Sequence, residues 1–290
     1  MSEGRTNIHR RRFGSALRSL RISAGLSGEE AAERLGIAGK SALSKIENGK
    51  QQVNSLGLTA FFAVYRVESE ATQAKVRHMA ALAAPAKRTN LLDEYPDAIT
   101  DDFEDYLNLE GMATSADVFF VQVIPGLLQT ERYATSVVER SAVWSTEREV
   151  ERFVALRLAR QAALQRENPL SLTCVIDEGA LRRVVGGPAV MRDQLQWLLK
   201  VMEQRKHVTI QVLPYSAGAH AAPDGSFQLL EFPMGSPVCV VETKTTSLYL
   251  EEDKDVELYG RTFTDLCKQA LDPTATCRYI ENMIKDFETS

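Results

Sequence analysis

The sequence predicts two domains: an all-α N-terminal domain of four or five helices and an α+β C-terminal domain with a mainly antiparallel sheet. Three observations lead to this prediction. In the first eighty residues, apolar positions recur with the period of short helices that end at glycines. Further along, helical patterns alternate with short apolar runs bounded by turn residues. The net charge also changes sign between the two regions.

The domain boundaries follow from the chain length and from the charge. A chain of 290 residues fits two domains, which we place at residues 8–84 and 96–287, with a linker at 85–95. Residues 1–88 contain 15 Lys and Arg against 7 Asp and Glu, a net charge of +8. Residues 89–290 contain 19 against 32, a net charge of −13. An anionic partner of the first domain explains this asymmetry, and a basic surface without a partner explains it equally well.

The first two predicted helices have marked ends. A basic amphipathic helix starts near Arg10 and ends at Gly25, a residue type that tolerates the positive φ of a helix end. Ser27 and Glu30 then form a capping box, in which each side chain satisfies a free amide at the start of the second helix. Gly36 ends that helix. One face of the first helix is apolar, at Phe13, Ala16, Leu17, Leu20 and Ala24.

A third short helix begins at Gly39 or Lys40 and ends at Asn48, before Gly49. Two short helices joined by a glycine-containing turn, after a basic helix, are typical of a helix-turn-helix domain. In such domains the second of the two short helices, here the third helix of the chain, enters the major groove of DNA, and its N-terminal side chains reach base edges. The buried positions of this helix are Leu43 and Ile46, and its outward positions are Lys40, Ser41, Ser44, Lys45 and Asn48.

Two further helices complete the first domain. The segment 70–84 is alanine-rich, and it either packs against the first helix or carries a dimer contact. The helix before it has core positions at Leu58, Phe61, Phe62 and Tyr65.

Residues 10–66 resemble the Cro/repressor (XRE) family of DNA-binding domains. The string Leu43–Gly49, LSKIENG, is similar to the family's recognition-helix ending of a hydrophobic residue, Ser, Arg or Lys, Ile, Glu, any residue and Gly. The turn at residues 36–40 is one residue longer than is usual, and a glycine stands where a Ser or Thr cap is common. The resemblance implies groove or base-edge contacts by Lys40, Ser41, Ala42 and Lys45, and phosphate contacts by Asn48, Lys50 and Arg21. Ser44, which faces outward on the same helix, is a further candidate DNA-binding residue.

The second domain mixes both kinds of element. Helices are predicted from Thr130 to Arg140, from a second capping box at Thr146 and Glu149 to about residue 167, and from Pro188. Two more follow, around residues 256–270 and after Asp272. Strands are predicted at residues 117–123, 172–176 and 207–212, and an antiparallel meander at 227–232, 238–243 and 248–250.

The second domain resembles the C-terminal domain of actinobacterial WhiJ-like regulators, over roughly residues 95–285. The strings that carry the match, in order, are residues 123–130, 177–183, 186–188, 211–214, 218–220, 224–227 and 231–233. Residues 92–96 depart from the pattern, because such proteins usually have a tryptophan-rich segment there. The resemblance implies a transcriptional regulator paired with a small BldB-like protein that docks on this domain, in an arrangement similar to toxin–antitoxin modules.

The sequence gives little indication of catalysis. No zinc spacing, P-loop, dinucleotide fingerprint or hydrolase motif is present, so we expect no enzyme, cofactor or metal. Cys174, Cys239, Cys267 and Cys277 form no C-x-x-C pair and are expected to be reduced thiols. A loop that contains Tyr215, His220 and Asp224 is a candidate ligand or partner pocket, although an ordinary turn at Asp224-Gly225 explains it as well.

Three functions therefore compete. The first is a cytoplasmic, homodimeric DNA-binding regulator whose acidic domain is tuned by a small protein or a ligand. The second is an antitoxin-like interaction protein that mainly holds a small partner and binds DNA only to regulate itself. The third is an enzyme with an N-terminal targeting domain. No apolar run is long enough to span a membrane, and the N-terminus lacks a secretory signal, so we expect no membrane partner.

Overall fold

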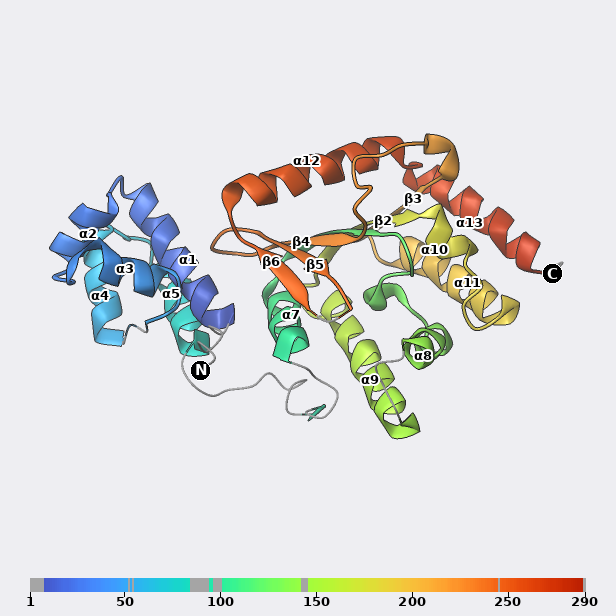
Figure 1. The fold of residues 1–290 in the computed structure, drawn as a ribbon, viewed down its shortest axis with the longest axis horizontal. Coiled ribbons are helices and arrows are strands. Elements are labelled where there is room, and N and C mark those ends of the chain that lie inside the picture. Colours follow the sequence, from blue (N-terminus) through green and yellow to red (C-terminus); the bar gives the residue numbers. More distant parts are fainter. Residues whose placement is uncertain are drawn as a thin grey trace. The chain divides into compact units, whose positions relative to one another are not determined.

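The structure is a computed structural model that describes residues 8–51, 53, 55–83, 94–95, 101–141, 146–244 and 246–288 (Figure 1). These residues form two compact units. The first contains α1 to α5, and the second contains the sheet and most of the helices after residue 100. The predicted linker at 85–95 lies outside the described residues except for 94 and 95, as does most of the segment 92–96. The domain boundaries therefore stay predictions.

The first unit is helical, as predicted. The capping box at the start of α2 is present, with the Ser27 amide donating to the Glu30 carboxylate at 2.8 Å and the Glu30 amide donating to Ser27 Oγ at 3.2 Å. The helices are α1 (Ile8–Ser23), α2 (Gly28–Arg34), α3 (Gly39–Glu47), α4 (Ser55–Val64) and α5 (Glu70–Ala83).

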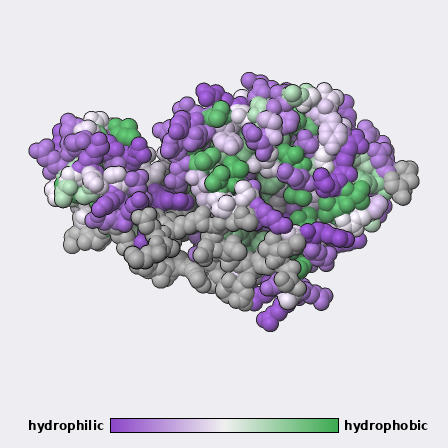
Figure 2. Space-filling view, in the orientation of Figure 1, coloured by the Kyte–Doolittle hydropathy of each residue, from purple (hydrophilic) through white to green (hydrophobic). Residues whose placement is uncertain are grey.

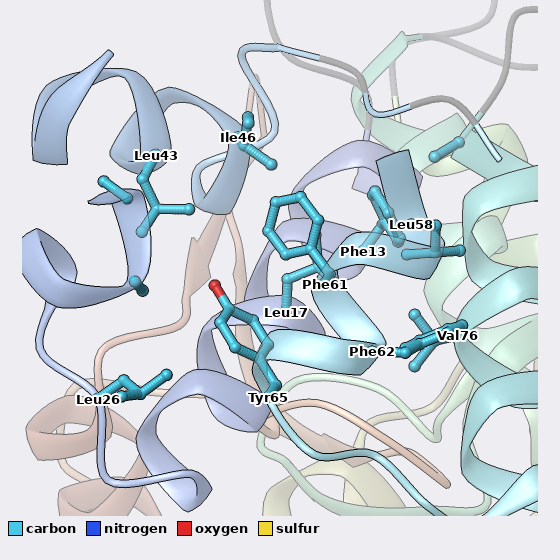
Figure 3. Close-up of a cluster of buried hydrophobic side chains, with 13 residues drawn as sticks. Phe13, Leu17, Leu26, Leu43, Ile46, Leu58, Phe61, Phe62, Tyr65 and Val76 are labelled. Atoms are coloured by element: carbon cyan, nitrogen blue, oxygen red, sulfur yellow. The ribbon is translucent and has the colours of Figure 1, made fainter. Parts of the chain in front are cut away.

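One apolar cluster holds these helices together (Figure 3). Leu43 and Ile46, the predicted buried positions of α3, lie in this cluster with residues of α1 and α4. The helix α5 packs against α1. Val76 joins the cluster, and Arg10 Nε donates to the Ala83 carbonyl at 3.4 Å. Packing within the unit is therefore one role of α5, while a dimer contact by its outer face stays untested.

The second unit is built on one six-stranded sheet, in the order β3-β2-β1-β4-β5-β6. The pairs β1–β2 and β2–β3 are parallel, whereas β1–β4, β4–β5 and β5–β6 are antiparallel. The strands are β1 (Ser115–Phe120), β2 (Ser171–Asp177), β3 (Val208–Leu213), β4 (Phe227–Glu231), β5 (Val238–Glu242) and β6 (Ser247–Leu250).

The mixed sheet corrects the prediction of a mainly antiparallel one. The predicted meander is present as β4, β5 and β6, but β1, β2 and β3 run parallel. Helices lie in the connections between these strands. Such a crossover brings the chain back to the end of the sheet where the previous strand began, so the next strand runs parallel to it. The helices of this unit are α7 (Asp101–Met112), α8 (Glu131–Arg140), α9 (Glu147–Ala159), α10 (Glu178–Arg182), α11 (Pro188–Gln204), α12 (Asp253–Gln269) and α13 (Pro273–Glu288).

Helices cover both faces of the sheet (Figure 1). On one face, Phe119 of β1 and Val175 of β2 pack in a cluster with Phe263 of α12. Because side chains alternate along a strand, Val118 and Cys174 point to the other face, and they are buried as well. Burial on both faces is typical of parallel strands and accounts for the apolar run in β2.

The largest differences from the predicted element boundaries are in β1 and α9. The strand β1 covers residues 115–120, instead of 117–123, and α9 ends at Ala159 instead of near residue 167. The chain continues from α9 as a short 3-10 helix, η3 (Arg160–Leu164). At the junction, the buried Arg160 guanidinium donates two hydrogen bonds to the Glu110 carboxylate of α7, at 2.9 and 2.7 Å. This ion pair therefore lies at the point where the backbone leaves the α-helix.

Candidate nucleic-acid interface

The turn between α2 and α3 sets the position of the candidate recognition helix. Leu35 is the C-cap of α2, and Gly36 follows with φ of +66°. The helix α3 begins at Gly39, after the N-cap residue Ala38, whose side chain makes no capping hydrogen bond. The structure thus places the first turn of α3 at Gly39, Lys40 and Ser41, and the cap position is Ala38 instead of the glycine that the sequence comparison placed there.

One face of α3 is buried and the opposite face is exposed. Leu43, Ile46 and Glu47 are buried, and Ala42 is half-buried. The exposed residues recur with helical spacing and so form a continuous polar stripe on the helix. They are Lys40, Ser41, Ser44, Lys45 and Asn48, and the exposed Lys50 follows after the helix. The visible face of the first unit, which carries α2 and α3, is mainly hydrophilic (Figure 2).

Two residues of this stripe already have neighbours. Lys40 Nζ lies 3.3 Å from a Glu29 carboxylate oxygen of α2, with both side chains about two-thirds exposed. Asn48 Nδ2 donates to Ser44 Oγ at 3.0 Å. An exposed ion pair contributes at most about 1 kcal/mol. The Lys40 ammonium can therefore exchange Glu29 for a phosphate or a base at little cost.

Arg21 differs from the other predicted contacts because its guanidinium is held inside the unit. Its Nε and Nη2 donate to the two carboxylate oxygens of Glu47 at 2.7 and 3.1 Å, and its Nη1 donates to the Leu26 carbonyl at 2.9 Å. The side chains of Arg21 and Glu47 are only 13% and 8% exposed. The hydrogen bond with Glu47 raises the pKa of Arg21, so the guanidinium stays charged. The pair ties α1 to the end of α3.

Two glycines allow α1 to approach the end of α3 closely. A Cβ atom added at Gly14 would lie 2.3 Å from the Glu47 carbonyl oxygen, and one added at Gly49 would lie 2.6 Å from the Arg10 carbonyl carbon. Gly49 also has φ of +70°. Neither glycine was among the predicted site residues, although a glycine inside an otherwise good helix, as at Gly14, is a signal of close packing.

The candidate residues of the second unit lie on the loop after β3. Tyr215 is 60% exposed, and its amide donates to the Glu178 carboxylate at 2.7 Å. The Ala222 amide donates to His220 Nδ1 at 3.2 Å, and the imidazole packs edge-to-face on Phe119. Asp224 is exposed in a turn, as the alternative interpretation of this loop predicted. A shared ligand pocket for Tyr215, His220 and Asp224 stays a prediction.

Among the described residues, no group of three or more His, Cys, Asp and Glu side chains is placed to hold a metal ion. Within the same part of the chain, every helix is too short or too polar to cross a bilayer. The four cysteines are free thiols, and burial raises the pKa of Cys267 to about 11.

Comparison with known families assigns both parts of the chain. Residues 12–76, which include α2, the turn and α3, match a family described as a helix-turn-helix domain. This match supports the class predicted from the sequence, an XRE-like DNA-binding regulator. Residues 103–282 match a family described as a domain of unknown function (DUF5753), and the chain belongs to that family. Comparison with curated proteins and with solved structures gave no match.

Proposed function

We propose that this chain is a sequence-specific transcriptional regulator that inserts α3 into the major groove of DNA. The polar stripe on α3 carries the proposal, because Leu43 and Ile46 anchor the opposite face of the helix in the core. A helix anchored in this way presents its polar side chains to base edges in a fixed orientation. The net charge of +8 on residues 1–88 favours the approach to phosphates.

Individual residues have different roles in this proposal. Lys40, Ser41, Ala42 and Lys45 lie at base edges or in the groove. Asn48 and Lys50 contact phosphates at the end of α3, and Ser44 supports Asn48 through their hydrogen bond. Arg21 acts as a positioning residue, since Glu47 occupies its guanidinium.

We further propose that the regulator is a cytoplasmic homodimer of the WhiJ-like type, whose second unit binds a small BldB-like protein. One short helix contacts only a few base pairs, and a two-fold dimer on a pseudo-palindrome doubles that contact. For the second unit we favour binding over catalysis. The imidazole of His220 accepts a backbone hydrogen bond and packs on Phe119, so its ring is already engaged within the loop.

The test is selection of duplexes from a random DNA library by the full chain, with and without the product of a small neighbouring reading frame. We expect enrichment of one sequence with two related half-sites, and a change in its affinity when the small protein is present. Enrichment of no sequence at physiological ionic strength, in both samples, would refute DNA reading. Enrichment that the small protein leaves unchanged would refute only the modulation.

A further inference from the structure

A groove lies beside the contact between α8 and α9 in the second unit. The two helices pack through Ala134 and Val138 of α8 and Val154 of α9. Next to this contact the helices leave a groove of about 460 Å³. Its lining residues are Glu131, Thr135 and Glu139 of α8, and Glu147, Val150, Glu151, Val154, Ala155 and Leu158 of α9.

The lining of the groove is regular. From α9 it takes positions i, i+3, i+4, i+7, i+8 and i+11, which form one face of about three turns, or roughly 16 Å. From α8 it takes every fourth residue. The floor is apolar, and its residues Val150, Ala155 and Leu158 are only half-buried. An apolar floor of this length along a helix face matches about three turns of another helix laid against it.

The rim of the groove is acidic. Among the described residues, the four charged side chains that line the groove are all glutamates, and each of them is exposed. Arg132, on the same helix as two of them, is turned to Asp193, with its Nη1 2.7 Å from the carboxylate. The N-terminal end of α9, where Glu147 and Glu151 lie, is covered by hydrophilic side chains (Figure 2). Carboxylates around an apolar floor complement a ligand that is apolar along its centre and positively charged along its edges.

We propose that the α8–α9 groove binds an amphipathic helix of a partner protein, with apolar residues at i, i+3 or i+4 and i+7 and with Lys or Arg on both flanks. The inference rests on the proposed function in one respect. That function gives the second unit a partner protein, and the inference assigns the surface at which the partner docks. The negative rim excludes DNA as the occupant. A small ligand is disfavoured because the charged groups are exposed at the rim instead of enclosed.

The test uses the full chain and a designed probe. The probe is a fluorescein-labelled 16-residue helical peptide with leucines along one face and lysines on both flanks, and the matched peptide carries glutamate in place of each lysine. Fluorescence anisotropy should show binding of the lysine peptide, weakening with added salt, and little binding of the glutamate peptide. Failure of the lysine peptide to bind better than the glutamate peptide overturns the proposal.

Variants locate the binding site. Glu147→Gln together with Glu151→Gln should lower the affinity for the lysine peptide by roughly three- to tenfold, since each exposed charge pair contributes modestly. The matched control, Glu203→Gln with Glu257→Gln, removes two exposed glutamates from α11 and α12 and should leave binding unchanged. Ala155→Arg, which fills the groove, should abolish binding at an unchanged Tm. If the groove variants bind the lysine peptide as tightly as the wild-type chain does, the assignment of the groove is wrong.

Two measurements on the same samples separate the remaining outcomes. If sedimentation shows that the groove variants dissociate an oligomer of the wild-type chain, a second copy fills the groove and the assignment to a partner protein is wrong. Duplex selection with the same protein tests the proposed function independently. If the chain selects a DNA sequence but fails the peptide test, only the groove assignment is wrong. If it passes the peptide test but selects no DNA sequence, only the proposal of sequence-specific DNA binding is wrong.

Discussion

The side chains predicted to contact DNA differ in how firmly they are held. Lys40 lies beside Glu29, and Asn48 donates to Ser44, whereas Arg21 is clamped by Glu47 inside the unit. Lys45 is exposed in the last turn of α3. Of the predicted contacts, Lys45 therefore offers the simplest test, because its removal breaks no contact described above.

We predict that Lys45→Ala weakens binding to the selected DNA sequence by about 1–3 kcal/mol, the range of a good base contact. Random duplexes should lose much less, because the side chain reads a base and does not merely attract phosphates. Fluorescence anisotropy on both duplexes measures the difference. Lys75→Ala, which removes an exposed lysine from α5, is the control and should change neither affinity strongly. Equal losses on both duplexes for Lys45→Ala would contradict base reading.

We predict that Glu47→Gln lowers the free energy of unfolding by about 1–3 kcal/mol, because the neutral amide leaves the partly buried Arg21 guanidinium without its carboxylate. It should also weaken DNA binding, although the change removes a negative charge near DNA. Denaturant unfolding and anisotropy measure the two effects.

Arg21→Met separates positioning from phosphate contact. If Arg21 only positions α3, the variant loses affinity while the dependence of log K on log salt keeps its slope. A phosphate contact, as the sequence alone predicted, would reduce the slope by about one. A tighter complex with Glu47→Gln, or a reduced slope with Arg21→Met, would count against the positioning role.

How far the sequence predicted the candidate site depends on the type of interaction. The exposed stripe and the anchors Leu43 and Ile46 follow from helical periodicity, so they could be predicted. The pairing of Arg21 with Glu47 could not be predicted, because the two residues are 26 positions apart in the sequence and charged residues are usually exposed to solvent. Spacing along the chain does not reveal which face of one helix meets another.

At the scale of elements, the crossing of α1 over the end of α3 depends on two glycines. Gly14 admits the Glu47 carbonyl, and Gly49 admits the backbone at Arg10. Gly36, in the turn before α3, has a similar positive φ but open space around its Cβ position. Substitution at Gly36 therefore reports the free-energy cost of a positive φ alone, substitution at Gly14 reports the cost of a backbone clash alone, and substitution at Gly49 reports both.

We predict that Gly36→Ala costs about 1–2 kcal/mol of stability through its positive φ alone. Gly49→Ala should cost a further 1–3 kcal/mol or so, because its Cβ meets backbone that cannot move aside easily. Gly14→Ala should show the contact cost without the φ cost. Denaturant unfolding of the three variants measures these differences. Equal destabilisation by Gly36→Ala and Gly49→Ala would contradict a close crossing.

The sheet shows which features of an element a sequence determines. The positions of β2 and of the meander were predicted from apolar runs and turns, but the directions of β1, β2 and β3 were not. Direction depends on the crossover between strands. The helical patterns between these strands were already visible in the sequence, and they are the signal that should have predicted parallel pairing.

One of the strings that carry the WhiJ-like resemblance, residues 123–130, holds elements of the second unit together. The buried Gln129 amide donates to the Ile124 carbonyl at 2.6 Å, and its oxygen accepts from Arg157 at 2.9 Å. Gln194 of α11, also buried, accepts from the Thr130 amide at 2.7 Å and donates to the Leu128 carbonyl at 2.8 Å. These residues explain why the loop before α8 has its sequence, and the reason is structural.

At the scale of the whole molecule, the opposite charges of the two parts of the chain restrict where a polyanion binds. The net charge of +8 on residues 1–88 attracts phosphates, and the −13 on residues 89–290 repels them. This charge distribution favours DNA binding by the first part of the chain, and it agrees with our proposal that the second part binds a protein. A dimer of such chains would present two α3 helices to one duplex.

The last prediction concerns the spacing of those two helices. A two-fold dimer in the major groove reads half-sites about one helical turn apart, roughly 34 Å or 10 base pairs. We therefore expect the selected duplex to bind two chains, as measured by sedimentation of the complex. Inserting five base pairs between the half-sites rotates one of them to the opposite side of the duplex, and affinity should fall to that of a single half-site. A single-site duplex with one scrambled half is the control. Unchanged affinity after the insertion would show that the chain reads DNA as a monomer.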